Sequence, residues 1–137
     1  MFTPARLASS KLMVRWIEIT KSQVTMKASV TELLKKIPGP LSEKWPQGER
    51  FAKAFSHGTM SVELYAPVGH DPQSPHGQDE IYFVVNGSSE FLLEDKCMDL
   101  AAGDAIFVPA GATHRFENFS DDFVTWVVFW GPRGGEK

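Results

Sequence analysis

Two stretches of the chain decide the fold: PHGQDEIYFVVNG, residues 75–87, and GDAIFVPAGATHRFEN, residues 103–118. Each holds a run of β-favouring residues bounded by glycine, proline or asparagine, which is the pattern of a short strand between tight turns. Alternate residues of an extended chain point to the same face, so one face of the first stretch carries His76, Gln78, Glu80 and Tyr82. The sequence therefore predicts a strand that presents an imidazole and a carboxylate to the interior.

Short β-favouring runs continue on both sides of these stretches, with turn signals between them. We expect strands at residues 51–55, 59–66, 80–85, 89–93, 104–108, 113–118 and 123–130. Asn86-Gly87 suits the positive backbone dihedrals of a two-residue hairpin loop, which would join the strand at 80–85 to the strand at 89–93. Many short strands without helices between them predict an all-β sandwich or barrel.

The chain before residue 51 differs in character from the predicted strands. Ser29 and Glu32 form a capping box, and Pro38-Gly39-Pro40 stops the run, so we expect a helix over residues 30–37, outside the barrel. Residues 12–19 are either an edge strand or part of a dispensable extension. We therefore expect three regions: an N-terminal extension with the helix at 1–50, a β-barrel at 51–130, and a flexible, Gly-rich tail at 131–137 that is too polar to pack.

Composition narrows the class of protein. The length of 137 residues suits one compact domain, and 42% hydrophobic with 23% charged residues is ordinary for a globular chain. Cys97 is the single cysteine, which excludes an internal disulfide and the Cys-rich zinc patterns and fits a reducing, cytoplasmic compartment. Any metal must therefore be held by histidine and carboxylate.

The formal charge of −3 is unevenly distributed, because residues 1–27 are basic and the remainder is acidic. The acidic part repels nucleic acid and has no basic stripe interleaved with aromatic side chains, so we expect no nucleic-acid partner. No apolar run approaches the roughly 18–20 residues of a membrane-spanning helix, so we expect no membrane partner. The basic, acid-poor start is similar to an organelle transit peptide, which is the alternative to a cytoplasmic location.

His76, Glu80 and His114 are the candidate metal ligands. A single histidine near a strand end is more often structural, but His114 lies in an ordered pattern of turn residues. Pro109 ends a strand, and Gly111 permits the tight reversal that brings His114 back beside Glu80. Two imidazoles and one carboxylate bind a divalent transition metal and leave coordination positions open for water or substrate.

The two stretches resemble the two conserved motifs of the cupin family. PHGQDEIYFVVNG is similar to the first motif, with six residues between Glu80 and Gly87, and GDAIFVPAGATHRFEN is similar to the second. The likeness covers residues 69–118, and the flanking strands extend it to most of 51–130. It implies a double-stranded β-helix, or jelly-roll barrel, with one divalent transition metal (iron, manganese, nickel, copper or zinc) and a homodimer formed through its sheets.

One departure from the family pattern concerns the first ligand. Cupins of this type usually carry His-x-His before the glutamate, and Ser74 stands where the first of these histidines would be. Gln78, His70 or a water molecule could fill the vacant position. We favour a triad of two histidines and one carboxylate, with His70 exposed in its loop and His57 as a turn residue.

The resemblance implies metal binding more firmly than it implies a reaction. The first interpretation is a metalloenzyme of oxygenase, isomerase or lyase type, in which Gln78 or Tyr82 orients a small polar organic molecule. The second is a non-catalytic module that binds or senses a small ligand, favoured by the lack of an obvious general base beyond the ligands. The third is a metal-free structural barrel. Candidates to line the pocket, each with barrel core as its default role, are Tyr82, Phe91, Phe116, Trp126 and Trp130.

Overall fold

The computed structural model describes residues 26–137, and residues 12–19 lie outside this part of the chain. Within it, one short helix precedes a series of eight strands. The elements are α2 (Val30–Leu34), β1 (Phe51–His57), β2 (Met60–Tyr65), β3 (Asp79–Asn86), β4 (Ser88–Leu93), β5 (Lys96–Ala101), β6 (Ala105–Val108), β7 (His114–Glu117) and β8 (Val124–Trp130). No helix among the described residues is long and apolar enough to cross a membrane.

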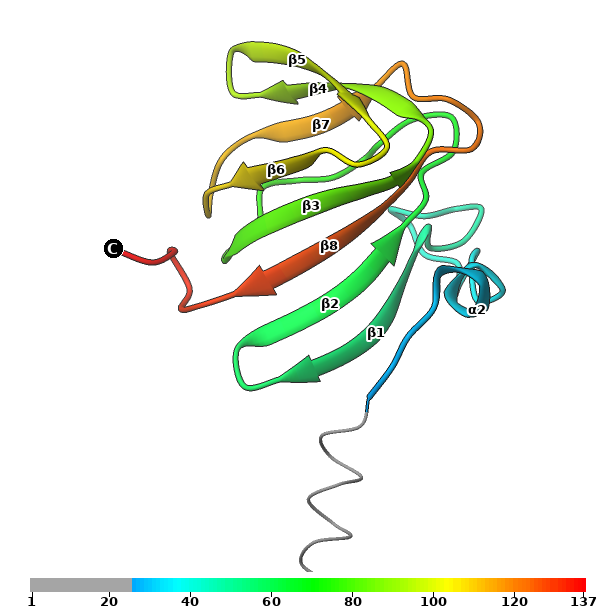
Figure 1. Ribbon diagram of the computed structural model, residues 1–137, viewed down its shortest axis with the longest axis horizontal. Coiled ribbons are helices and arrows are strands. Elements are labelled where there is room, and N and C mark those ends of the chain that lie inside the picture. Colours follow the sequence, from blue (N-terminus) through cyan, green and yellow to red (C-terminus); the bar gives the residue numbers. More distant parts are fainter. Residues whose placement is uncertain (1–25) are drawn as a thin grey trace, which may run out of the picture.

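The strands form two antiparallel sheets that face each other (Figure 1). The larger sheet has the order β1-β2-β8-β3-β6, and the smaller has the order β5-β4-β7. In the larger sheet β8 lies between β2 and β3, and in the smaller sheet β7 pairs with β4, so strands that are distant in the chain become neighbours, as in a jelly roll. The prediction of an all-β double-stranded β-helix is confirmed.

The Asn86-Gly87 turn joins consecutive strands, as predicted, but it does not form a hairpin. β3 pairs with β6 and β8, whereas β4 pairs with β5 and β7, so the turn carries the chain from one sheet to the other. Of these two residues, Gly87 has a positive φ, of 76°, and Asn86 does not. Asn86 instead donates from its amide to the Asp122 carbonyl at 3.0 Å, which fixes the corner.

β5 was not among the predicted strands. Its apolar residues Met98 and Leu100 face inward, but Asp99 between them is exposed, as are Lys96 and Cys97 before them. The run is therefore short and polar enough to look like a loop. It forms a strand because β4, which precedes it in the chain, provides its backbone hydrogen-bond partners.

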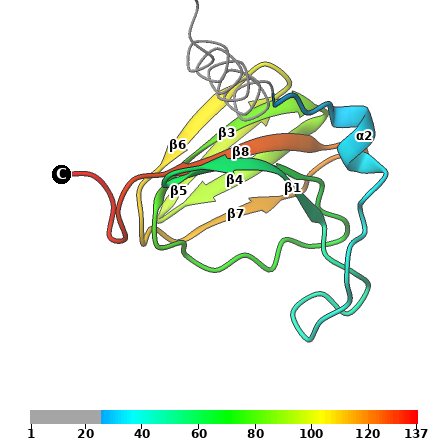
Figure 2. The same ribbon diagram turned by 90° about the horizontal axis from the view of Figure 1, so that it is seen from below.

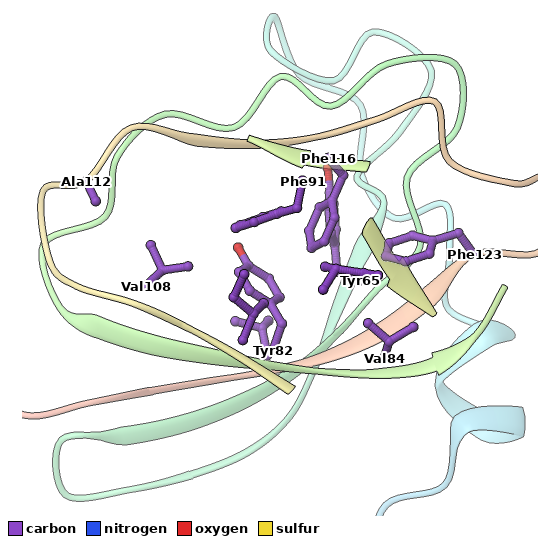
Figure 3. Packing of buried hydrophobic residues seen from close by; sticks show 11 residues of the cluster. Tyr65, Tyr82, Val84, Phe91, Val108, Ala112, Phe116 and Phe123 are labelled. Atoms are coloured by element: carbon purple, nitrogen blue, oxygen red, sulfur yellow. The ribbon is translucent and has the colours of Figure 1, made fainter. Parts of the chain in front are cut away.

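The centre of the barrel is packed with aromatic side chains. Figure 3 shows Tyr82, Phe91, Phe116 and Phe123 between the two sheets. The ring centroids of Phe116 lie 4.8 Å from Phe91 and 4.9 Å from both Tyr82 and Phe123. Burial of each ring contributes roughly 1.5–3 kcal/mol, so this cluster stabilises the contact between the sheets.

Helix α2 lies outside the barrel, as expected, and covers part of the outer face of the larger sheet (Figure 2). Leu33 packs there against Leu64 and Val124. Ser29 caps the helix by accepting from the Glu32 amide at 3.2 Å. The helix ends at Leu34, three residues before the predicted end, since Pro38 disfavours helical backbone in the residue before it and the chain tightens into a turn.

The C-terminal tail packs, which differs from our expectation for residues 131–137. The Gly131 amide donates to Thr59 Oγ1 at 3.0 Å, and the Gly134 amide donates to the Gly77 carbonyl at 2.7 Å. Asp79 accepts from the Glu136 amide at 2.8 Å. Composition did not reveal this packing because the contacts are backbone hydrogen bonds rather than burial of apolar side chains.

Candidate metal centre

Three predicted ligands converge inside the barrel. His76 Nδ1 lies 3.0 Å from Glu80 Oε1, and His114 Nε2 lies 2.8 Å from the same oxygen. One potential ligand atom from each residue falls within 4.8 Å of the others. Glu80 and His114 are almost fully buried, while His76 is half-buried. The side chains are therefore close enough to share one cation.

The local sequence explains this convergence. Glu80 is at an inward-facing position of β3, and His114 begins β7 in the opposite sheet. Gly111 has a φ of 79°, and its amide donates to the His76 carbonyl at 2.8 Å. This hydrogen bond ties the loop before β7 to the loop before β3, so the turn that we predicted at Gly111 positions both histidines.

The hydrogen bonds around the three residues fit a metal site. His114 Nδ1 lies 2.9 Å from the Ala112 carbonyl and donates to it, which leaves Nε2 to face Glu80. Metal-binding histidines commonly donate their other ring N–H in this way. Glu80 Oε2 is buried and has no hydrogen-bond partner among the described residues. A bound cation would provide this oxygen with a partner.

The charges of Glu80 and His114 depend on each other. Burial alone would raise the pKa of Glu80, but its hydrogen bonds with His114 and His76 outweigh burial and lower it. Burial alone would lower the pKa of His114, but the hydrogen bonds with Glu80 and with the Ala112 carbonyl raise it. The carboxylate thus favours a proton on His114, and a metal ion bound at Nε2 would take the place of that proton.

Tyr82 lies directly beside the cluster. Its hydroxyl is 3.2 Å from His114 Nε2 and donates to Gln73 Oε1 at 3.1 Å. Gln73 is held in turn by Asp71, which accepts from its amide at 3.0 Å. Burial and the nearby charges of Glu80 and Asp71 raise the pKa of Tyr82, so the phenol stays neutral and retains its proton.

A cavity of about 560 Å³ opens beside His76. Its wall is divided into an apolar part and a polar part. The apolar part comprises Trp45, Phe51, Tyr65, Val127 and Phe129, and the polar part comprises Lys44, Ser61, Glu63, Gln73, His76, Gln78 and Arg133, with Gly77 between His76 and Gln78. The barrel is thus filled by aromatic side chains at its centre and open on the side of His76.

The structure distributes the other predicted site residues differently. Gln78 lines the cavity, but its amide nitrogen donates to the Thr59 carbonyl at 3.0 Å and to the Gly131 carbonyl at 2.9 Å. Trp126 does not reach the cavity. It pairs with Leu64 and packs in the outer cluster beneath α2, because Val127 and Phe129 occupy the inward positions of β8.

Ser74, which stands where the family pattern has a histidine, lies outside the group formed by His76, Glu80 and His114. Ser74 is exposed and accepts from Lys44 Nζ at 3.1 Å. His70 is exposed, as expected. His57 is also exposed, but it is the last residue of β1 rather than the turn residue that we predicted. The pocket candidates Tyr82, Phe91 and Phe116 belong to the core, which was their default role.

Three charged residues of the cavity were missed by the sequence interpretation: Glu63, Lys44 and Arg133. Glu63 could have been found, because it alternates with Ser61 and Tyr65 on the inward face of β2. Lys44 lies in the loop before β1 and Arg133 in the tail, where no periodicity indicates which way a side chain points. Burial raises the pKa of Glu63, as does Glu80, while Lys53 and His76 partly offset them.

Three proteins are similar in sequence to parts of this chain. An uncharacterized protein of Streptomyces coelicolor is 44% identical over 75 residues, which are 53% of this chain and 71% of that protein. A dimethylsulfoniopropionate lyase of Ruegeria pomeroyi is 34% identical over 56% of this chain, and an acireductone dioxygenase of Sulfurihydrogenibium is 42% identical over 44% of it. The matches span only 39% of the lyase and 37% of the dioxygenase.

Solved structures share the fold. A Thermus thermophilus protein superposes with a TM-score of 0.55 at 23% identity, over 82% of this chain and all of its own. A cupin 2 conserved barrel domain protein of Salinispora arenicola gives a TM-score of 0.51 at 20% identity, over 59% of this chain and 74% of its own. The family model described as a cupin domain matches residues 61–130. The chain therefore belongs to the cupin family, as its two motifs predicted.

Proposed function

We propose that the protein is a metal-dependent enzyme acting on a small polar organic molecule, with His76, Glu80 and His114 as the metal ligands. The observation that carries this proposal is the buried Glu80 carboxylate, which faces two imidazoles, one of which, His76, lines a cavity of about 560 Å³. A bound divalent transition metal would polarise a carbonyl or carboxylate, or activate water or oxygen. The relatives that are named as a lyase and a dioxygenase support the lyase and oxygenase reaction types.

The side chains around the cavity have separate roles in this proposal. Trp45, Phe51 and Phe129 form an apolar wall that excludes water from the substrate. Tyr82, whose phenol stays neutral, donates a hydrogen bond near the ligands. Glu63 faces the same space and has no partner among the described hydrogen bonds, so it is free to accept or return a proton. This residue supplies the general base that the sequence interpretation lacked.

The non-catalytic alternative shares the ligands and the cavity, so turnover separates the two functions. The untagged protein would be stripped with a chelator, reloaded with iron, manganese, nickel, copper or zinc, and screened against small organic acids, carbonyl compounds and sugars. An enzyme should convert a substrate only in a reloaded form and not as the His114→Ala variant. Saturable binding without conversion by any metal form would establish the binding module instead.

A further inference from the structure

The cavity carries two cationic side chains at its polar wall, Arg133 and Lys44. We propose that these two residues bind the carboxylate group of the substrate, which makes the substrate class a small organic acid. This inference rests on the proposed function, since it places the acid in the cavity that one of the proposed metal ligands, His76, lines. It assigns a role to the C-terminal tail and to the loop before β1.

The backbone around Arg133 is fixed on both sides. Before it, the Gly131 carbonyl accepts from Gln78 Nε2 at 2.9 Å. After it, the Gly134 amide donates to the Gly77 carbonyl at 2.7 Å. The guanidinium lies against Gly77, where an added Cβ would be 3.6 Å from its Nη2 atom. The tail therefore holds this side chain next to the segment that supplies His76.

Arg133 differs from the other two arginines of the described residues in its partners. Arg50 donates to the Ala66 carbonyl at 2.8 Å, and Arg115 forms a salt bridge with Glu117. Within residues 26–137, the Arg133 guanidinium has neither a hydrogen-bond acceptor nor a salt-bridge partner. Its planar fork of donors suits a carboxylate, which can accept two parallel hydrogen bonds.

Lys44 adds a second positive charge to the same wall. Its Nζ donates to the Ser74 hydroxyl at 3.1 Å, and this neutral partner leaves the charge of the ammonium group uncompensated. The bond also explains the residue at position 74. Where the family pattern has a metal-binding histidine, this chain has a serine that orients a lysine toward the cavity.

The remaining charges of the cavity favour a carboxylate over a phosphate. Glu63 lines the same space, and Glu80 lies behind His76, so negative charge is already present. A phosphate dianion would be repelled by these groups more strongly than a carboxylate monoanion. Trp45, Phe51 and Phe129 offer an apolar wall for a short carbon chain. The geometry thus fits an acid with one carboxylate and a small apolar body.

Binding can be tested on the metal-free protein with butanoate as the probe, followed by the backbone amide NMR signals of Gly77 and Gly134. We expect saturable shifts with butanoate and none with butanamide, its neutral analogue. Arg133→Gln should weaken butanoate binding roughly tenfold, as expected for loss of a charged hydrogen bond. Arg133→Lys should recover part of the affinity. Arg115→Gln, an arginine outside the cavity, is the matched control and should bind like the wild type.

Equal affinity of Arg133→Gln and Arg115→Gln, or equal binding of butanamide, would overturn the proposal. Tighter binding of methyl phosphate than of butanoate would overturn the choice of carboxylate. The metal ligands are not needed for this measurement, so butanoate binding should persist in His114→Ala. If the protein bound no metal, butanoate could still bind at Arg133 and Lys44. If butanoate did not bind, the metal content would be unaffected.

Discussion

The two oxygens of Glu80 have different surroundings. Oε1 faces His114 Nε2 at 2.8 Å and His76 Nδ1 at 3.0 Å, whereas Oε2 is buried without a partner among the described residues. A buried carboxylate oxygen without a donor costs roughly 1–3 kcal/mol or more. A cation held by the three side chains would remove this cost and stabilise the folded protein.

Glu63 is the residue whose replacement should separate chemistry from metal binding. Glu63→Gln keeps the shape of the side chain but cannot take up a proton, so kcat should fall roughly a hundredfold or more while the metal content stays at the wild-type level. Glu43→Gln, an exposed glutamate in the loop before β1, is the control. Wild-type kcat in Glu63→Gln would show that this carboxylate takes no part in the reaction.

The pH profile gives a second measurement of the same residue. Burial raises the pKa of Glu63 above the ordinary range of a glutamate, although Lys53 and His76 partly offset this. If the ionised carboxylate acts as a base, the rate should increase as the pH rises through this raised value. This increase of the rate with pH should be absent in Glu63→Gln. If the increase persisted in that variant, it would belong to another titrating group.

At the scale of elements, the corner between β3 and β4 depends on one glycine. A Cβ on Gly87 would lie 2.4 Å from Ser120 Oγ and 2.9 Å from Phe123 Cα, in addition to the strain of a positive φ. Gly58 also has a positive φ but has no neighbouring atom within 4 Å of its added Cβ. The two positions therefore separate steric overlap from backbone strain.

Gly58→Ala should lower the free energy of unfolding by about 1–2 kcal/mol, the cost of left-handed backbone. Gly87→Ala should cost about 1–3 kcal/mol more, because Ser120 and the backbone at Phe123 must move. Urea unfolding of both variants measures the difference. Equal destabilisation would mean that the corner yields freely and that the glycine is required only for its dihedral angles.

Sequence patterns predicted the elements that have a strong periodicity or a rigid turn. Glu80 and Tyr82 alternate on β3 as predicted, and the reversal at Gly111 brings His114 to Glu80. His76 instead lies in the loop before β3, where its carbonyl accepts from the Gly111 amide. β5 was missed because only Met98 and Leu100 mark its inward face, and the residues beside them are exposed. The tail was misjudged because its contacts are made by backbone amides. Such contacts depend on which segment lies opposite, and local sequence does not contain that information.

At the scale of the whole molecule, the outer face of the larger sheet has an apolar region beyond α2. Cross-strand pairing aligns Val62, Val128, Ile81 and Phe107 in one row across four strands. In the described part of the chain, Phe83 and Phe107 on this face have 44% and 50% of their surface exposed. Apolar side chains in such a row often mark an interface between proteins. The expectation of a homodimer stays a prediction, and this row is where we expect its interface.

Light scattering with size exclusion tests this expectation. The wild-type protein should elute with about twice the chain mass of 15.3 kDa. Phe107→Ser should shift it toward the monomer, because a hydroxyl replaces an apolar ring at the interface. Leu41→Ser changes an equally apolar, exposed residue of the loop before β1 and should leave the mass unchanged. A monomeric wild type, or a dimer unaffected by Phe107→Ser, would contradict the assignment.

Elemental analysis of the untagged protein tests the metal centre most directly. The wild type should carry about one divalent transition-metal ion per chain, and so should His57→Ala, which removes an exposed histidine from the end of β1. His114→Ala and Glu80→Gln should lose the ion, with circular dichroism used to confirm that both variants are folded. A metal centre at these side chains requires this contrast between the buried candidate ligands and the exposed histidine. Retention of wild-type metal content by folded His114→Ala would contradict it.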